Sequence, residues 1–513
     1  MINSKMLTDK LDSLVQERGK LIYVILIFIY SCIGAMMLIS QGYTPSDDAL
    51  RHSGKVIAGK SWQQILLFDN PNLGDVHHGW HSFLTLINNN FLHSDVPEPI
   101  MLFSIAFLFI YAVFLPSLFV KRKDIYIIVM GIFSLVSFSL FMRELIARPL
   151  VVSMANLTIL LLTWQQLKKD KTPYRWYILY FSLYLFGIYL HPSWYLNAIP
   201  FLAFMLAGEI KVAVKFACII ALATLSAAVL SGDFVNFFYQ QYYIITTITS
   251  SYYDTTQLVG ELQPRIINFT LISSVFFLLL VKHLAGFDFK KSINRPSFII
   301  VILSALLIEK ATRFWVDIGQ VALFVWFIKE LTELLEDEID KKPLKSFVWI
   351  IFAFIFSFST LVINFNGRWT SGRKKAFPSI ATSKPELKEW FPGKGGIVYS
   401  SSMGVFYEMF YADPKANWRY ILGYESAFMP KDDLNTLRDI QWEGGHHLLY
   451  KPWIEKMKPE DRLVINYNPA HFKSEFKQLE WKFIKRGFWF GRLKKDYKPE
   501  TKKESTDDSK KKS

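Results

Sequence analysis

The sequence has very few cysteines and little charge for its length. Its 513 residues include only two cysteines, Cys32 and Cys218, and both lie inside apolar runs. Neither a disulfide framework nor a cysteine-based metal site is therefore expected. Charged residues make up only 20% of the chain, whereas hydrophobic residues make up 51%, with 45 Phe, 24 Tyr and 15 Trp. This composition is typical of a lipid-embedded protein and not of a soluble one.

Several common motifs are also missing. The sequence contains no P-loop, GxGxxG or CxxC, so the usual nucleotide-binding and redox signatures are absent. The first apolar run, 21–40, is too long for the core of a cleavable signal peptide and lacks a small-residue cleavage site, so we expect a signal anchor. The net charge is +14, but the lysines form short clusters between apolar runs instead of one basic surface. Orientation signals explain such clusters, and no nucleic-acid partner is expected.

Apolar runs dominate the first 365 residues. A membrane-spanning helix needs about 20 mostly apolar residues, and this criterion predicts about 11 transmembrane helices. They lie near 21–40, 99–120, 124–142, 149–167, 176–192, 195–210, 213–231, 266–283, 297–311, 315–332 and 346–365. The expected fold is mainly α, a polytopic membrane protein.

The basic clusters predict how these helices are oriented. If the N-terminus is cytoplasmic, the connections after the even-numbered spans all hold clusters of lysine and arginine, as the positive-inside rule requires. The clusters are Lys121–Lys123, Lys168–Lys171, Lys211 with Lys215, Lys290 and Lys291 with Arg295, and Lys341 and Lys342 with Lys345. We therefore predict a multi-pass protein with a cytoplasmic N-terminus. The Lys-rich composition suggests the inner membrane of a bacterium.

Three stretches should then face the opposite side. The first loop, 41–98, belongs to the transmembrane domain (1–365) and has a helical pattern suited to the membrane interface. The stretch 232–265 is rich in Tyr and Thr, and its part 239–253 is either a substrate groove or an interfacial aromatic belt. Residues 366–493 read as a small extracytoplasmic α/β domain, periplasmic or extracellular, with strands at 396–400 and 462–466 and a helix near 432–440. The basic tail, 494–513, is predicted to be disordered.

A polar segment follows directly on the first apolar run. It contains two adjacent carboxylates, Asp47 and Asp48, followed by Arg51 and His52. Helix capping alone could explain the acidic pair. The other interpretation is a general base at the membrane surface, or a pair of ligands for Mg²⁺ or Mn²⁺. Because charge next to a membrane span is costly and usually functional, the position favours the second interpretation.

Further polar candidates lie in the short turns on the same side. Arg143 and Arg148 flank one turn, Lys310 and Arg313 lie in another, and His191 lies in a third. Basic residues near span ends often reach lipid headgroups without any catalytic purpose. Arg143 and Arg148 nevertheless stand out, because basic residues should be sparse on this side.

A histidine-rich segment, 77–81, lies within the first loop. His77 and His81 could share one helix face, as metal ligands often do, but an aromatic, polar loop at headgroup level is the favoured interpretation. Substrate contact is compatible with both. The candidates for it are His52, His78, Trp80, His81 and His191.

The order of these features resembles the GT-C superfamily of glycosyltransferases, which use polyprenyl-phosphate-linked sugars. The resemblance rests on a first span, a far-side loop that opens with Asp47-Asp48-Ala-Leu-Arg51, interfacial helices, many further spans and a far-side C-terminal domain. It implies that a first-loop acidic residue is catalytic, which here means Asp47 or Asp48. A WWDYG-like stretch is absent from the C-terminal domain, which argues against an oligosaccharyltransferase.

The resemblance implies a specific reaction. A sugar would pass from a polyprenyl-phosphate donor to a glycan, lipid or protein acceptor, with inversion and with Asp47 as the favoured base. The donor phosphate would be bound by arginine and lysine side chains, namely Arg51, Arg143, Arg148, Arg313 and Lys310. A flippase or transporter of lipid-linked glycans should line its path with polar residues on several spans, whereas charge here concentrates at far-side loops. A polysaccharide polymerase or ligase remains an alternative.

Overall fold

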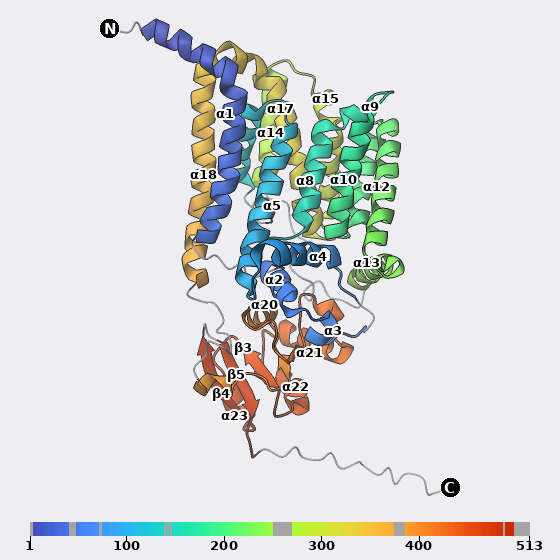
Figure 1. Ribbon diagram of the computed structural model, residues 1–513, viewed down its shortest axis with the longest axis vertical. Coiled ribbons are helices and arrows are strands. Elements are labelled where there is room, and N and C mark those ends of the chain that lie inside the picture. Colours follow the sequence, from blue (N-terminus) through green and yellow to red (C-terminus); the bar gives the residue numbers. More distant parts are fainter. Residues whose placement is uncertain are drawn as a thin grey trace.

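A bundle of long helices and a small sheet domain form the two ends of the molecule (Figure 1). The computed structural model describes residues 4–40, 48–70, 74–137, 140, 143, 146–249, 269–373, 385–485 and 488–496. The N-terminus lies at the end of the bundle that is far from the C-terminal domain (Figure 1). Cys32 and Cys218 are both free.

Each of the eleven predicted apolar runs contains a helix. These helices are α1 (Ser4–Ser40), α5 (Pro97–Phe119), α6 (Lys123–Val136), α8 (Leu150–Thr163), α10 (Tyr174–Leu190), α11 (Ala198–Leu206), α12 (Ile210–Leu230), α14 (Phe269–Leu284), α16 (Pro296–Leu307), α17 (Gln320–Lys341) and α18 (Pro343–Arg373). Within the described residues, four segments are long and apolar enough to cross a membrane: Lys10–Met36, Pro97–Phe119, Ile210–Leu230 and Pro343–Ile363. The chain is therefore a mainly helical membrane protein, and the count of about 11 spans stays a prediction.

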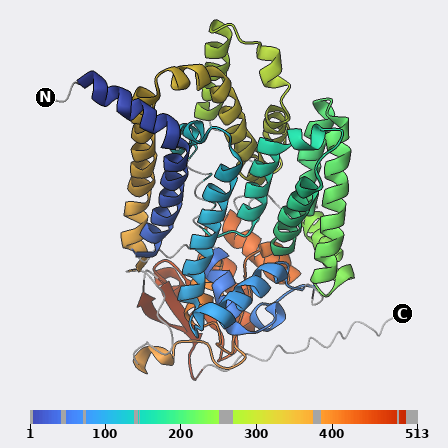
Figure 2. The same ribbon diagram turned by 45° about the horizontal axis from the view of Figure 1, so that its top comes forward.

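Aromatic packing holds the first and last long helices together. α1 and α18 lie side by side in both views (Figures 1 and 2). Tyr30 of α1 is fully buried and makes edge-to-face contacts with Phe354 and Phe358 of α18, an arrangement that aromatic rings prefer. α18 continues to Arg373, beyond the domain boundary predicted at 365.

The basic connections gather at the N-terminal end of the bundle. The short helices α9 (Gln165–Lys168) and α15 (Phe289–Ile293) lie there (Figure 1). Ion pairs tie neighbouring connections together: Arg122 Nη1 lies 2.9 Å from Asp340 Oδ1 and Lys168 Nζ 2.6 Å from Glu209 Oε1. The basic clusters thus share one end, opposite the C-terminal domain.

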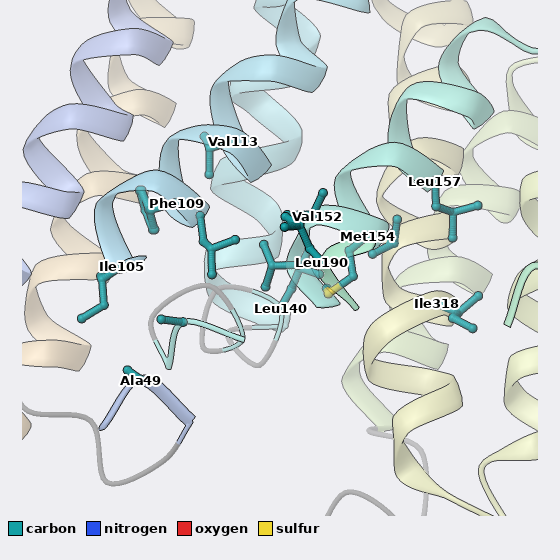
Figure 3. Packing of buried hydrophobic residues seen from close by; sticks show 14 of the residues in the cluster. Ala49, Ile105, Phe109, Val113, Leu140, Val152, Met154, Leu157, Leu190 and Ile318 are labelled. Atoms are coloured by element: carbon teal, nitrogen blue, oxygen red, sulfur yellow. The ribbon is translucent and has the colours of Figure 1, made fainter. Parts of the chain in front are cut away.

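Short helices fill the space between the bundle and the C-terminal domain. They are α2 (Asp48–Ala58), α3 (Trp62–Ile65), α4 (His78–Ile87), the π-helical turn η1 (Asn88–Leu92) and, below α12, α13 (Phe234–Thr249), which is seen end-on (Figure 1). Figure 3 shows Ala49 of α2 below Ile105 and Phe109 of α5, and all three side chains are buried. The helical pattern predicted for the first loop is therefore present.

The C-terminal domain is a five-stranded mixed sheet with the order β2-β1-β3-β5-β4. Strand β1 pairs in parallel with β2 and β3, whereas β5 is antiparallel to β3 and β4. Two of these strands, β1 and β3, form where the sequence predicts strands, and α21 forms where it predicts a helix. The domain's elements are α19 (Pro385–Lys388), β1 (Ile397–Tyr399), α20 (Met403–Ala412), β2 (Arg419–Tyr420), η5 (Ser426–Phe428), α21 (Lys431–Trp442), η6 (His447–Tyr450), α22 (Lys451–Lys456), β3 (Arg462–Ile465), α23 (Ala470–Glu475), β4 (Leu479–Lys485) and β5 (Phe488–Leu493).

The first loop docks onto the edge of this sheet. Leu66 forms a parallel bridge with Tyr420 of β2, and the Leu67 N–H donates to the Tyr420 carbonyl at 3.0 Å. The Asp69 N–H donates to the Phe428 carbonyl at 2.9 Å. The loop therefore extends the sheet by backbone pairing, which positions the C-terminal domain against α2 and α3.

Candidate functional site

The predicted acidic segment becomes the start of α2 and faces two arginines. Asp48 Oδ1 lies 2.7 Å from Arg51 Nη2, and Asp48 Oδ2 lies 3.4 Å from Arg148 Nε. Residues 48 and 51 meet because they are one helical turn apart, whereas Arg148 comes from the turn before α8. Asp47, the favoured base, lies outside the described residues.

The ion pairs determine the charge of Asp48. Burial acts to raise the pKa of its carboxyl, but the guanidinium groups of Arg51 and Arg148 outweigh burial and hold the pKa well below its usual range. Asp48 is therefore ionised at neutral pH and is a weak base. Its geometry suits the holding of two arginines better than proton abstraction.

A second ion group contains two more of the predicted arginines. Arg143 Nε lies 2.9 Å from Asp317 Oδ1, and Arg313 Nε lies 3.3 Å from Asp317 Oδ2. Arg313 Nη2 is also 3.3 Å from His191 Nε2. Asp317 is almost fully buried in the π-helical segment η4 (Phe314–Gly319). The sequence signal for it is a carboxylate inside the apolar run 315–332, which is expensive near lipid.

A chain of hydrogen bonds leads away from Arg51 through two histidines. His52 Nε2 lies 3.2 Å from Arg51 Nη2, His52 Nδ1 lies 2.8 Å from His81 Nε2, and His81 Nδ1 lies 2.6 Å from Asp75 Oδ2. Arginine only donates and an ionised carboxylate only accepts. These ends fix both imidazoles as neutral Nδ1–H tautomers, with every N–H pointing from Arg51 toward Asp75.

The carboxylate of Asp75, at the end of this hydrogen-bond chain, has several further partners. Asp75 Oδ1 accepts from the indole N–H of Trp62 and from the backbone N–H of His77, both at 3.1 Å, and Lys55 Nζ lies 3.8 Å from Oδ2. Burial acts to raise the Asp75 pKa, but His81 and Lys55 outweigh it and hold the pKa well below its usual range. His52 and His81 are buried, where their hydrogen bonds orient Arg51, and substrate contact by either stays a prediction.

Two further imidazoles connect the two ion groups. The ring of His77 lies 5.0 Å from that of His52 and 5.1 Å from that of His191, measured between centroids. Burial lowers the pKa of His77 to about 3 and the pKa of His191 well below its usual value, and the nearby arginines add to both shifts. Both rings are therefore neutral at physiological pH. The four arginines thus belong to one site at the base of the bundle.

The C-terminal domain contributes two residues that the sequence did not indicate. The ring of Tyr424 lies 4.3 Å below the guanidinium carbon of Arg51, a cation–π contact. The neighbouring Glu425 is buried, and its Oε1 has no hydrogen-bond partner among the described residues. Burial raises the pKa of Glu425 to about 7, against the opposing effect of Arg313 and Arg51. No local sequence pattern indicates these two residues, because only the backbone pairing of the first loop with β2 brings them to the site.

Three predicted residues lie elsewhere. Lys310 is exposed and, in the part of the chain that the structure describes, makes no ion pair. His78 is exposed and points along α4, with Nε2 3.4 Å from Ser82 Oγ. Trp80 is fully buried, where it stacks on Phe83. Its indole packs there, and the substrate contact suggested by its place in the loop stays a prediction.

The described residues do not fit the predicted divalent metal. Both Asp48 oxygens face guanidinium groups, and no group of three His, Cys, Asp or Glu residues within the described ranges could hold an ion. His77 and His81 have ring centroids 6.5 Å apart and serve different partners. The described arrangement suits an anion, which guanidinium groups bind directly.

Comparisons with known proteins do not assign a family. No protein-family model and no curated protein matches the sequence. The chain is similar to the crystal structure of the oligosaccharyltransferase of Archaeoglobus fulgidus, which is tethered through a disulfide bond to an acceptor peptide containing the NVT sequon. The TM-score is 0.46 at 10% sequence identity, and the match covers 88% of this chain and 70% of that one. At this score and identity the likeness establishes neither a family nor an activity.

Proposed function

We propose that this protein is a membrane glycosyltransferase of the GT-C type that uses a polyprenyl-phosphate-linked sugar. One observation carries the proposal: Arg51 is 3% exposed, and its Nε and Nη1 have no hydrogen-bond partner among the described residues. Unpaired donors on a buried cation cost free energy. A phosphate oxygen that enters the site would satisfy them with charge-assisted hydrogen bonds.

The position of the site supports a lipid-linked donor. The arginines lie where the bundle meets the C-terminal domain, at the end opposite the basic connections (Figure 1). A polyprenyl chain would stay in the bilayer while its phosphate reaches this level. We therefore place the site at the extracytoplasmic surface of the bacterial inner membrane, with the N-terminus in the cytoplasm.

The reaction would be a single displacement. An acceptor hydroxyl attacks the anomeric carbon, the bond from that carbon to the phosphate oxygen breaks, and the lipid phosphate leaves with the electron pair. The hydroxyl proton passes to Asp47 as base. Asp48 keeps Arg51 and Arg148 in place, and these arginines stabilise the charge that grows on the departing phosphate. One displacement inverts the anomeric centre, and no second catalytic carboxylate is required.

The two aspartates give a direct test of this assignment. Purified Asp47→Asn should release polyprenyl phosphate about 100-fold more slowly than the wild type with unchanged thermal stability. Asp48→Asn should lose thermal stability in addition to activity, because it leaves a buried arginine without its carboxylate. Full turnover by a folded Asp47→Asn variant would show that another group is the base.

A second experiment tests the phosphate site. Arg51→Gln should raise the KM for the lipid donor, whereas Arg175→Gln, the same change at an exposed arginine, should not. The wild-type protein in vesicles should break the donor down, either by hydrolysis or by transfer of its sugar. Movement of intact donor across the bilayer without its breakdown would instead identify a flippase.

A further inference from the structure

A polar cavity lies beside the arginine site, between the start of α4, the end of α10 and α13. Its volume is about 210 Å³. Its polar and aromatic lining includes Asp75, His78, Tyr189, Asp233, Asn236 and Gln240. The mechanism proposed above uses Asp75 only as the end of the hydrogen-bond chain and leaves the cavity itself without a role.

The lining has the chemistry of a site for a neutral ligand. No lysine or arginine lines the cavity within the described residues, so an anion would meet carboxylates without a compensating cation. Both carboxylates already have partners: Asp75 is held by His81 and Lys55, and Asp233 Oδ1 accepts the Asn236 backbone N–H at 3.1 Å. A bare cation would therefore find little spare negative charge. What remains are amides, an imidazole and aromatic faces.

Two amide side chains of α13 line the cavity. Gln240 is 7% exposed and Asn236 is half-buried, and both side chains line the cavity. Residues 236 and 240 share one face of α13 because they are four apart. Both amides border the open space of the cavity, so they can donate to and accept from the hydroxyls of a ligand there.

Gly74 lies against these amides. A Cβ at Gly74 would lie 2.5 Å from Gln240 Nε2 and 3.0 Å from Asn236 Nδ2. A side chain there would shift the flexible end of Gln240 and crowd that of Asn236. The loop before α4 therefore leaves room for them to converge on the cavity.

We infer that this cavity binds a neutral saccharide, an inference that rests on the proposed glycosyl transfer. The amides and the imidazole match the hydroxyls of a sugar, and Tyr189 and Phe237 in the wall offer apolar contact for its ring face. Asp75 belongs both to the cavity wall and to the chain that ends at Arg51. The saccharide site is thus adjacent to the phosphate site. Its occupant is either the sugar of the donor or the end of an acceptor glycan.

The test combines a binding measurement with kinetics on the purified full-length protein. Saturation-transfer NMR would follow the binding of a panel of neutral methyl hexosides and disaccharides, with no lipid donor present. The double variant Asn236→Ala/Gln240→Ala removes two hydrogen-bonding groups from the cavity wall, so it should bind about tenfold more weakly. Val235→Ala, at a 76% exposed position of the same helix, is the control and should bind as the wild type does.

Each outcome has a defined meaning. Loss of binding in the double variant alone, at unchanged thermal stability, supports the site. Equal binding by the wild type and the double variant overturns it, and so does the absence of binding by any panel member to the wild type. A raised KM for the lipid donor alone assigns the site to the donor's sugar, and a raised KM for the acceptor alone assigns it to the acceptor. If no donor is turned over, the glycosyl-transfer proposal fails, but the binding result still decides whether the cavity takes a saccharide.

Discussion

Replacing Asp75 by asparagine tests whether the two histidines act through Arg51. The asparagine side chain keeps the shape of Asp75 but puts an NH₂ group where one oxygen was. If the NH₂ group replaces Oδ2, it meets the His81 Nδ1–H, and both histidines must change tautomer. As a result, the Nη2–H of Arg51 would face the Nε2–H of His52, and both groups are donors. If it replaces Oδ1 instead, it meets the indole N–H of Trp62, which also only donates.

Either orientation leaves a buried pair of donors facing each other. An unsatisfied buried group costs about 1–3 kcal/mol. If the conflict lies at Arg51, the loss appears in catalysis, and the same free energy corresponds to a roughly 5- to 150-fold fall in kcat/KM for the lipid donor. If the conflict lies at Trp62, the loss appears mainly as reduced thermal stability.

The assay is donor turnover together with thermal unfolding in detergent. Asp69→Asn is the matched control, because it makes the same change at an exposed position in the same loop. A double-mutant cycle with Arg51→Lys separates a role in the chain from a role in the cavity wall. Action through Arg51 predicts that the two effects do not add. Wild-type kinetics and wild-type stability in Asp75→Asn would refute the hydrogen-bond chain.

Three further predictions follow from the same geometry. The pKa of Glu425 is raised to about 7, so its carboxyl ionises as the pH rises through this value. The new charge competes with the donor phosphate for the arginines, so the KM for the donor should rise. Glu425→Gln should remove this rise. His77 is neutral in the fold because its pKa is lowered to about 3, whereas in the unfolded chain it binds a proton below about pH 6.5. His77 should therefore lower the free energy of unfolding by about 1.4 kcal/mol at pH 5.5. The free energy of unfolding should vary less with pH in His77→Gln than in the wild type. A Cβ at Gly79 would lie 1.9 Å from the Tyr189 carbonyl oxygen, so Gly79→Ala should lower the melting temperature by several degrees, whereas Gly404→Ala, at an open helical position, should not.

The apolar helices and some of the arginines leave local signals in the sequence. Apolar runs mark the helices, and two short strands, β1 and β3, form where buried apolar residues lie between turns. Arg143 and Arg148 are detectable as basic residues where the positive-inside rule leaves few, and Arg51 is detectable from its place beside the acidic pair. The structure brings these arginines into one site. Whether Asp47 is the base stays a prediction.

The remainder of the site depends on contacts that are distant in sequence. Lys310 and Arg313 look alike in the sequence, yet only Arg313 is one helical turn from Asp317 and reaches it. Tyr424 and Glu425 belong to a domain whose local pattern gives only strands and helices. They join the site through backbone pairing with residues more than 350 positions earlier, and no periodicity predicts that pairing.

That pairing has a consequence for how the chain can be divided. The segment around Leu66 and Leu67 covers the outer edge of β2. A fragment that begins at the C-terminal domain would leave this edge bare, together with the apolar face that Trp62 now covers through Phe406 and Phe410. Bare strand edges recruit other strands, so the isolated fragment should self-associate. A synthetic peptide spanning α3 and the following residues should restore it to a monomer.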